Sequence, residues 1–412
     1  MQTGIPTQPG RSGPGFREFV LLIAGLMAMN ALSIDSMLPA FPQIGHALHV
    51  LRENDLQLIV IIYMLGFGIA QLGYGPLSDR FGRKPVLTAG ILLYVAFSVI
   101  VSLSRSFPLL LAGRFCQGVA SASTRVLAIS IVRDCYSGRT MARVMSLTFM
   151  VFLAVPILAP SVGQFVLLFA GWRWIFYVLT IFGSVVLVWT GLRLPETLHP
   201  EYRRAIDLRD IASAFRLALT QRQAIGYTLI SMLLNGGLMA YVSSVQQIFT
   251  DTFHAERIFP IAFALAAVGM AIGSLVNARI VEAWGMRRIS HSAIIGFAVV
   301  GFVHLAIALS GRESLPLFVA MQAMQMFLLA LATSNVSALA MEPLAAIAGT
   351  AASLQGFVTT VGGALIGLAI AQQFDGTAVP TVASYGVLGL GGLAVAYLVE
   401  RGRLFQAHPA TA

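Results

Sequence analysis

The chain has 412 residues, of which 57% are apolar and only 10% are charged. Such a composition cannot cover a soluble globule with polar surface, so it excludes a soluble protein and indicates an integral membrane protein. The net charge of +9 does not indicate nucleic-acid binding, because the basic residues fall mainly between the apolar segments, as they do in cytoplasmic loops.

Twelve apolar segments reach the length that a helix needs to cross a bilayer, about 20 residues. They are continuous apolar runs without the alternation of barrel strands, so the predicted fold class is an all-α integral membrane protein with twelve transmembrane helices. The segments cover residues 18–40, 55–78, 86–104, 108–132, 142–170, 172–194, 223–249, 258–282, 289–310, 314–341, 346–373 and 381–400.

The basic residues predict the orientation. With a cytoplasmic N-terminus, 19 of the 26 basic residues lie on the cytoplasmic side, five lie on the other side, and Arg114 and Arg125 lie inside the fourth span. This bias places both termini in the cytoplasm. We find no cleavable signal peptide and expect the first span to stay as an anchor. The expected parts are a cytoplasmic tail (1–17), two six-helix halves (18–194 and 223–400), a cytoplasmic amphipathic linker (195–222) and a second cytoplasmic tail (401–412).

Asp35, in the first span, is the one residue among 17 acidic residues that lies well inside an apolar segment. A carboxylate near the middle of a bilayer costs about 2.5–3.5 kcal/mol, so such a residue is by default a candidate for ion or proton handling. Desolvation favours the neutral acid, which would let the group take up and lose a proton. The other reading is structural: Asp35 pairs with a buried arginine, or it reaches the outer headgroups.

The stretch 75–87, between the second and third spans, reads GPLSDRFGRKPVL. Gly75 permits close approach of another helix, Gly82 permits a tight turn, and Asp79 stands among bases that could hold a cytoplasmic latch. The stretch resembles, without a break in the pattern, the motif that proteins of the major facilitator superfamily carry at this place. That resemblance implies a role in conformational exchange and not in substrate choice. The residues assigned to gating are Gly75, Asp79, Arg80, Gly82, Arg83 and Lys84, with Arg133 and Asp134, which could latch onto this loop or bind headgroups.

The fourth span contains Gly113-Arg114-Phe115-Cys116-Gln117-Gly118. This resembles a second motif of the superfamily, whose arginine is tied to proton transfer in proton-driven members. At 1.5 Å per residue, Asp35 is about 24–27 Å along the first span, and Arg114 is about 9 Å along the fourth span, which runs the other way. Both are therefore expected in the outer half of the bilayer, where they could meet or share a water. Arg125 is three turns further along, where it lines the inward path or snorkels.

The fifth span contains two prolines, which free backbone carbonyls and kink a helix. Pro156, Pro160 and Gly163 resemble the antiporter motif of drug exporters, although Ala159 and Gln164 stand where that motif has glycine. A wider resemblance, over nearly the whole chain, is to the Bcr/CflA drug-resistance subfamily of drug/proton antiporters. It rests on Asp35 to Pro42, Arg114 to Gln117, Arg133-Asp134, Pro156 to Gly163, Gly171 to Phe176, and Met341 to Leu344 followed by Ala348 to Ala351.

The linker between the sixth and seventh spans is the longest connection. Apolar residues at near-helical spacing predict an amphipathic helix on the cytoplasmic surface, and a floppy charged segment is the alternative. These apolar residues are Ile206, Ile211, Phe215, Ala218 and Leu219.

The two halves echo each other at a constant offset of 203 residues. Asp79, Phe81, Gly82, Lys84 and Val86 align with Glu282, Trp284, Gly285, Arg287 and Ile289. The shared order of acid, aromatic, glycine and base favours duplication over chance similarity of loops. It predicts two pseudo-symmetric six-helix halves, the architecture of major facilitator proteins.

By the same resemblance, spans one, four, seven and ten line a central cavity, with spans five and eight near it. Methionine and aromatic side chains suit a roomy apolar site, and a few amides give orientation. For each candidate taken singly, packing is the simpler explanation. The candidates are Asn30, Gln117, Arg125, Phe149, Met150, Asn235, Met239, Tyr241, Gln322, Gln325 and Met326.

The predicted function is proton-coupled efflux of small, largely apolar drugs across the bacterial inner membrane by alternating access. The alternatives are export of an endogenous metabolite, such as an amino acid derivative, and a non-transporting membrane sensor with the same fold. We expect no enzyme activity, because no nucleotide loop, metal-ligand spacing or hydrolase elbow is present in the sequence.

The expected coupling ion is the proton, with no other cofactor and no metal. Cys116 and Cys135 lie about 28 Å apart if their span is helical, too far for a disulfide. The expected partners are a drug-like small molecule and membrane lipid, with no nucleic acid, and the chain is expected to be a monomer.

Overall fold

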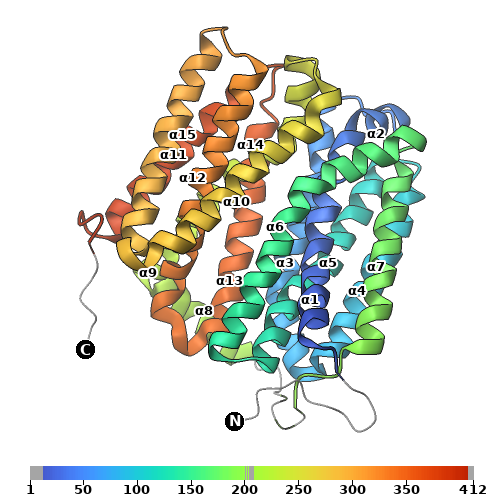
Figure 1. The fold of residues 1–412 in the computed structure, drawn as a ribbon, viewed down its shortest axis with the longest axis vertical. Helices are drawn as coiled ribbons and strands as arrows, with labels where there is room; N and C mark the ends of the chain where they lie inside the picture. Colours follow the sequence, from blue (N-terminus) through green and yellow to red (C-terminus); the bar gives the residue numbers. More distant parts are fainter. Residues whose placement is uncertain (1–12, 200, 202, 204–207, 407–412) are drawn as a thin grey trace. The chain divides into compact units, whose positions relative to one another are not determined.

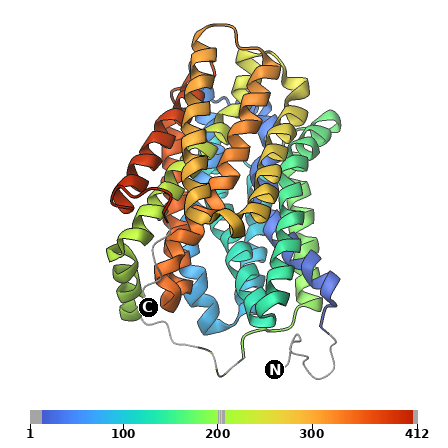
Figure 2. The ribbon, with the colours of Figure 1, turned by 60° about the vertical axis from the view of Figure 1, so that its left-hand side comes forward.

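The computed structural model describes residues 13–199, 201, 203 and 208–406. This part of the chain consists of helices and short connections and contains no β-strand, which confirms the predicted all-α fold class. The chain divides into two compact units, Met1–Leu208 and Arg209–Ala412. The division falls within the stretch 195–222 that the sequence marks as a linker. Figures 1 and 2 show each unit as a bundle of long helices.

The helices follow the predicted spans closely. In the first unit they are α1 (Phe16–Asp35), η1 (Leu38–Ala40), α2 (Phe41–Ala47), η2 (Glu53–Gln57), α3 (Leu58–Phe81), α4 (Arg83–Ser102), α5 (Phe107–Cys135), α6 (Gly138–Phe169) and α7 (Arg173–Arg193). After the linker helix α8 (Leu208–Thr220), the second unit contains α9 (Arg222–Gln247), η4 (Ile248–Thr252), η5 (Glu256–Ile258), α10 (Phe259–Trp284), α11 (Met286–Leu309), α12 (Leu315–Met341), η6 (Glu342–Ile347), α13 (Ala348–Phe357), η7 (Val358–Gly362), α14 (Gly363–Ala371) and α15 (Val379–Val399).

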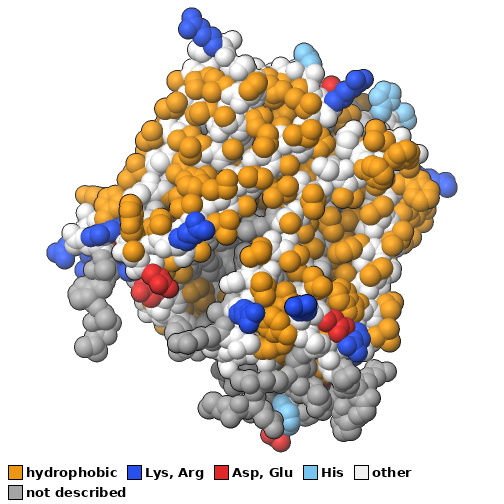
Figure 3. All heavy atoms as spheres, viewed as in Figure 1, with side chains coloured by type: hydrophobic (Ala, Val, Ile, Leu, Met, Phe, Trp, Pro, Cys, Tyr) orange, Lys and Arg blue, Asp and Glu red, His pale blue; other side chains and the backbone are white. Residues whose placement is uncertain are grey.

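Eleven helical stretches of the described chain are long and apolar enough to cross a membrane. The remaining predicted span, 142–170, falls on α6, a helix of 32 residues that includes the apolar stretch Ala154–Phe169. Apolar side chains cover most of the face drawn in Figure 3. Large ones such as Leu158, Phe165 and Ile181 are more than half exposed. Lipid covers such a surface favourably and water does not, so the chain is a multi-pass membrane protein.

The first predicted span is interrupted. α1 ends at Asp35, and the chain continues through η1 and α2 as far as Ala47. Pro39 explains the interruption, because proline has no N–H to donate and disfavours a helical conformation in the residue before it. Asp35 therefore stands at the end of a helix within the span, and not in the middle of an unbroken one.

The eleventh predicted span contains a wide π-helical turn, η7, between α13 and α14. Asn235 of α9 donates its Nδ2–H to the carbonyl of Thr359 in that turn, at 3.0 Å. A Cβ added to Gly362 or Gly363 would strike Met232 or Asn235, so α9 packs directly on the turn. An inserted side chain of this kind is a known cause of local widening in a helix.

Equivalent helices contact each other through glycine in both units. In the first unit, a Cβ on Gly66 of α3 or Gly118 of α5 would collide with the backbone of the facing helix. In the second unit, Gly269 and Gly273 of α10 meet the backbone of α12 in the same way. Small residues let helix backbones approach closely inside a membrane, so the predicted internal repeat extends to the packing.

The turns after α3 and after α10 also share one conformation. Gly82 has φ 102° and ψ 154°, and Gly285 has φ 80° and ψ 148°. Residues with a side chain rarely adopt this conformation, so both turns require glycine. The glycine pair found at the offset of 203 residues thus has a structural reason.

A helix occupies most of the described linker. Ala218 of α8 is buried against Ala224, Leu344 and Ala351 of the second unit, while Leu219 is exposed. Ile206 of the predicted apolar face lies outside the described residues. α8 is therefore attached to the second unit by a small contact near its C-terminal end.

Candidate functional site

Asp35 is the last residue of α1 and is only 6% exposed. It lies about 29 Å along α1, at 1.5 Å for each residue from Phe16. Its neighbours Ile34, Met37 and Leu38 are buried and apolar. Within the described part of the chain, no hydrogen bond or ion pair is formed by its carboxyl group. Burial by protein argues against a headgroup contact, and among the described residues no arginine pairs with Asp35.

Arg114 lies on α5 and is completely buried. Its Nη2 donates to the carbonyl of Ser33 at 3.1 Å and its Nε to the carbonyl of Ile59 at 3.2 Å. Its Nη1 donates to Oε1 of Gln117 at 2.6 Å, and its guanidinium carbon lies 4.3 Å from the centre of the Tyr63 ring. The guanidinium therefore donates hydrogen bonds to three acceptors, one on each of three helices.

A direct ion pair between Asp35 and Arg114, which their predicted depths allow, is not formed. Arg114 instead binds the Ser33 carbonyl, in the last turn of α1 and two residues before Asp35. A cation at this place suits the negative C-terminal end of the helix dipole. Arg114 thus fixes the end of α1 on which Asp35 stands.

Further hydrogen bonds orient the groups around Arg114. Gln117 donates its Nε2–H to Ser98 Oγ at 2.7 Å, and Ser33 Oγ lies 2.6 Å from Tyr94 Oη. The Tyr63 hydroxyl donates to Asn30 Oδ1 at 3.0 Å. Asn30 and Gln117, both predicted to line a cavity, therefore serve in this buried network.

Arg125 differs from Arg114 in its surroundings. It is exposed, and its described contact is with the ring of Phe67, at 6.0 Å from guanidinium carbon to ring centre. It lies ten residues before the end of α5 at Cys135, about 15 Å from that end. A charged side chain at such a position normally faces water and not lipid.

The antiporter motif on α6 contacts the chain beside Asp35. Ala159 and Pro160 are buried, and a Cβ added to Gly163 would collide with the carbonyl oxygen of Ser36. Glycine is required here because the backbones of α6 and the end of α1 touch. The motif and the acidic residue, 128 positions apart in the sequence, form one region of the first unit.

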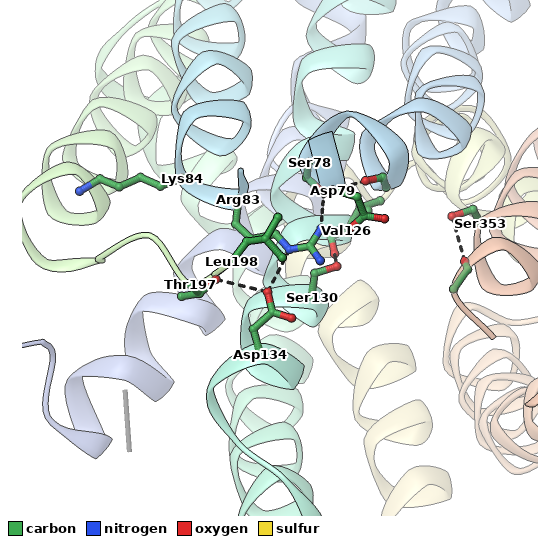
Figure 4. A network of polar contacts seen from close by, with 12 residues as sticks. Ser78, Asp79, Arg83, Lys84, Val126, Ser130, Asp134, Thr197, Leu198 and Ser353 are labelled. Atoms are coloured by element: carbon green, nitrogen blue, oxygen red, sulfur yellow. Dashed lines mark hydrogen bonds and ion pairs between the residues drawn. The ribbon is translucent and has the colours of Figure 1, made fainter. Parts of the chain in front are cut away.

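A polar cluster lies at the turn between α3 and α4, and Figure 4 shows its residues Ser78, Asp79, Arg83 and Asp134. We call Ser78, Asp79, Arg83, Asp134 and Glu196 the α3–α4 network. Arg83, at the centre of the network, is only 4% exposed. Its Nη1 lies 2.5 Å from Asp79 Oδ1 and 2.6 Å from Ser78 Oγ. Its Nε lies 2.9 Å from Asp134 Oδ2. Asp134 comes from the end of α5, so a contact between Asp134 and this loop, which the sequence allows, is formed.

Glu196, which follows α7, caps the first turn of α4. Its carboxylate accepts hydrogen bonds from the backbone N–H groups of Arg83 and Lys84, at 2.9 and 3.2 Å. It also accepts from those of Thr197 and Leu198, at 3.0 Å each. A Cβ on Gly82 would lie 2.5 Å from Glu196 Oε2, so the glycine leaves room for the cap.

The sequence does not single out Glu196, because it lies 113 residues from Arg83. One signal was available. The first turn of α4 has no acidic residue and follows a glycine, so its free N–H groups need an acceptor from elsewhere.

The other residues assigned to gating have smaller contacts. The Gly75 carbonyl accepts from Ser78 Oγ at 2.9 Å, Arg80 stacks on Phe81 at 5.2 Å, and Lys84 Nζ donates to the Gly191 carbonyl at 2.9 Å. Arg133 is exposed and makes none of the contacts described for the α3–α4 network.

The second unit contains a similar cluster at the turn between α10 and α11. Arg287 binds Glu342 at 3.3 Å and Glu400 at 3.1 Å, and the Tyr227 hydroxyl donates to Glu400 at 2.6 Å. We call these four residues the α10–α11 network. Glu342 follows α12 as Asp134 ends α5, and Glu400 follows α15 as Glu196 follows α7. In both units an acid near the end of α5 or α12 binds the arginine side chain at the turn, whereas Glu196 binds the backbone N–H groups of the turn and Glu400 binds the Arg287 side chain.

Most cavity candidates of the second unit are buried in packing. Tyr241 stacks on Phe263 at 5.8 Å, Gln322 accepts from the Tyr385 hydroxyl at 3.0 Å, and Gln325 donates to the Phe297 carbonyl at 3.2 Å. Met239 and Met326 are also buried, and Asn235 binds the turn η7 as described above.

Two further candidates belong to α6 in the first unit. Met150 is 62% exposed. The side chain of Phe149 lies outside the described part of the structure.

The fold and these networks define a helical membrane protein built from a repeated unit. A sequence profile of the Major Facilitator Superfamily matches residues 22–367. The chain belongs to this superfamily. It is accordingly a transporter and not an enzyme.

Two curated proteins illustrate the relatives. The chain is 29% identical over 388 residues to the bicyclomycin resistance protein homolog of Haemophilus influenzae, with 93% of this chain and 96% of that protein covered. It is 34% identical over 180 residues to the multidrug resistance protein MdtL of Escherichia coli O157:H7, with 44% and 46% covered. The resemblance to drug-resistance members of the superfamily is confirmed.

Solved structures show the same fold. The xylose transporter XylE from E. coli, in a partially occluded inward open conformation, has a TM-score of 0.73 with 13% identity, and 96% of this chain and 99% of that chain are covered. At this identity the likeness concerns the fold alone.

Proposed function

We propose that this transporter exports small, largely apolar drugs across the bacterial inner membrane in exchange for protons. The observation that carries the proposal is the position of Asp35, a buried carboxyl group without a described partner at the interrupted end of α1. The names of the relatives support drugs as the cargo.

The coupling step is a competition for Arg114. With Asp35 protonated, Arg114 binds the Ser33 carbonyl, as it does in this structure. When Asp35 loses its proton, the carboxylate attracts the guanidinium more strongly than a carbonyl does, because both partners are then charged. The end of α1 then changes its hold on α5, and protonation is linked to the position of a helix.

Alternating access gives the direction. Facing the outside, Asp35 takes up a proton and substrate is released; facing the cytoplasm, it loses the proton and substrate binds. The membrane potential contributes about 2.3 kcal/mol per charge per 100 mV to this cycle. The excess of basic residues on one side of the membrane, 19 against five, supports a cytoplasmic location for both ends of the chain.

The α3–α4 network then acts as a latch for one state. It joins the α3–α4 turn to the end of α5 through Arg83 and Asp134, and to the segment after α7 through Glu196. Buried ion pairs of this kind suit a contact with two stable states, because separating the two charges costs free energy. Asp79 is the most exposed acid bound to Arg83 and is the natural point of release.

Transport into inverted membrane vesicles tests the proposal. We expect vesicles with the wild-type protein to take up an antibiotic such as bicyclomycin when a proton gradient is applied. Asp35→Asn or an uncoupler should reduce uptake to the level of vesicles without the protein. Glu53→Gln, which changes an exposed acid of the same unit, serves as the matched control. Uptake that survives both Asp35→Asn and the uncoupler would contradict the scheme.

A further inference from the structure

A groove of about 650 Å³ lies on the surface of the first unit. Five of its lining residues come from one face of α4, and two come from the segment after α7. The seven residues are Lys84, Pro85, Thr88, Ala89, Leu92, Glu196 and Arg203.

One end of the groove is basic. Lys84 Nζ is held at the Gly191 carbonyl. The Arg203 Nη2 lies 3.4 Å from the place that a Cβ of Gly82 would occupy, so this guanidinium folds over the start of α4. Among the described residues, no hydrogen bond or ion pair engages the Arg203 guanidinium. The groove thus presents two cations at the same end of α4.

The acid among these lining residues, Glu196, lies at the same end: the place of a Gly82 Cβ is 2.5 Å from its Oε2 and 3.4 Å from the Arg203 Nη2. Both carboxylate oxygens of Glu196 accept backbone N–H groups, four in all, as its role in capping α4 requires. These four donors engage the carboxylate in capping α4, although Glu196 still lines the groove. The lining has a net charge of +1, from two bases and one acid.

The other end of the groove is apolar. Pro85, Ala89 and Leu92 recur at helical spacing, and all three are exposed, Leu92 by 51%. Leu92 lies about 12 Å along α4 from Lys84, at 1.5 Å per residue. Because α4 is one of the apolar spans, its uncovered wall faces lipid chains.

We infer that this groove binds an anionic glycerophospholipid, with the phosphate at Lys84 and Arg203 and one acyl chain along Pro85, Ala89 and Leu92. A free phosphate ion would leave the apolar wall unused. A zwitterionic lipid brings an ammonium group, and the only acid available to it already accepts four hydrogen bonds. Charge and shape together therefore select an amphiphile with net negative charge. The inference does not depend on which substrate the transporter moves.

Native mass spectrometry of the purified full-length protein tests the site. The probes are phosphatidylglycerol, phosphatidylethanolamine and inorganic phosphate, each added to delipidated protein in detergent. We expect phosphatidylglycerol to remain bound preferentially. Arg203→Gln should weaken its binding about fivefold, the effect of one base near a lipid headgroup. Ala89→Trp, which fills the apolar end without removing charge, should weaken it as well.

The matched control is Arg105→Gln, which removes an exposed arginine beyond the opposite end of α4. It should leave phosphatidylglycerol binding unchanged, and the melting temperature of every variant shows that it is folded. The inference would be overturned by any of three results. The two lipids bind equally, Arg203→Gln and Arg105→Gln have equal effects, or inorganic phosphate alone competes with the lipid.

Discussion

Arg114 shows why an arginine, and not merely a positive charge, is needed inside the first unit. Its three nitrogen atoms donate in three directions, to Ser33 on α1, Ile59 on α3 and Gln117 on α5 itself. A guanidinium offers five donors in a rigid plane, whereas an ammonium is a point charge on a flexible stem. The geometry of the site therefore depends on the shape of the group.

Arg114→Lys should destabilise the protein although it keeps the charge. One ammonium cannot reach all three acceptors, so at least one buried carbonyl loses its donor, at a cost of about 1–3 kcal/mol. Thermal unfolding in detergent measures the loss. Arg125→Lys is the control, because that side chain is exposed and stacks on a ring. Equal losses in the two variants would show that the hydrogen-bond geometry is unimportant.

Glu196 allows a second test on a single side chain. In Glu196→Gln an amide N–H₂ replaces one carboxylate oxygen and faces backbone N–H groups that need an acceptor. Loss of a helix cap of this kind costs about 1 kcal/mol. Glu201→Gln, at a side chain that is 81% exposed, should change the melting temperature little. If both variants melt together with the wild type, the cap contributes nothing to stability.

The limits of the sequence reading are clear at these two residues. Counting residues along two antiparallel spans gives the heights of Asp35 and Arg114 in the membrane. It does not give the direction in which each side chain leaves its helix, and Arg114 turns to the Ser33 carbonyl. Glu196 was missed for a related reason: the first turn of α4 shows that an acceptor is needed, but nothing local shows which distant residue supplies it.

At the scale of elements, α1 and α6 depend on each other at one contact. α1 stops at Asp35 because of Pro39, and the chain beyond it presents the Ser36 carbonyl directly to Gly163. The span boundaries were predictable, because each follows from a continuous apolar run. The interruption at Asp35 and the π turn η7 were not, because both arise from tertiary contacts and proline within runs that look uniform.

Gly163→Ala should force α6 away from the end of α1. The added Cβ meets backbone and not the end of a flexible side chain, so overpacking of about 1–3 kcal/mol is expected, with loss of transport in the vesicle assay. Gly191→Ala is the control, because it lies within α7 and a Cβ there would have no atom within 4 Å. That variant should be neutral or slightly stabilising, since alanine favours helix. Normal transport by Gly163→Ala would disprove the importance of this contact.

At the scale of the whole molecule, each unit has a base at its repeated turn that binds two acids from the ends of its helices. Arg83 does so in the first unit with Asp79 and Asp134, and Arg287 in the second with Glu342 and Glu400. The repeat was visible in the sequence through its glycine and through Lys84 and Arg287, but in the first unit the neighbouring Arg83 binds the acids. Asp79 belongs to the repeated stretch, but Asp134, Glu342 and Glu400 lie at the ends of other helices, so only the folded chain assigns these three to the two networks.

Double-mutant cycles distinguish coupling within a unit from coupling between units. Arg83→Gln leaves Asp134 without its basic partner, and removing one member of a buried pair costs about 3–5 kcal/mol. In combination with Asp134→Asn the losses should fall short of additivity by about 0.5–3 kcal/mol, because both changes break the same contact. In combination with Arg287→Gln they should add within about 0.5 kcal/mol, because the contacts of each base lie within its own unit. Unfolding by denaturant in micelles gives the free energies. A large coupling between Arg83 and Arg287 would mean that the two networks form one cooperative latch, and that neither unit can open its basic turn alone.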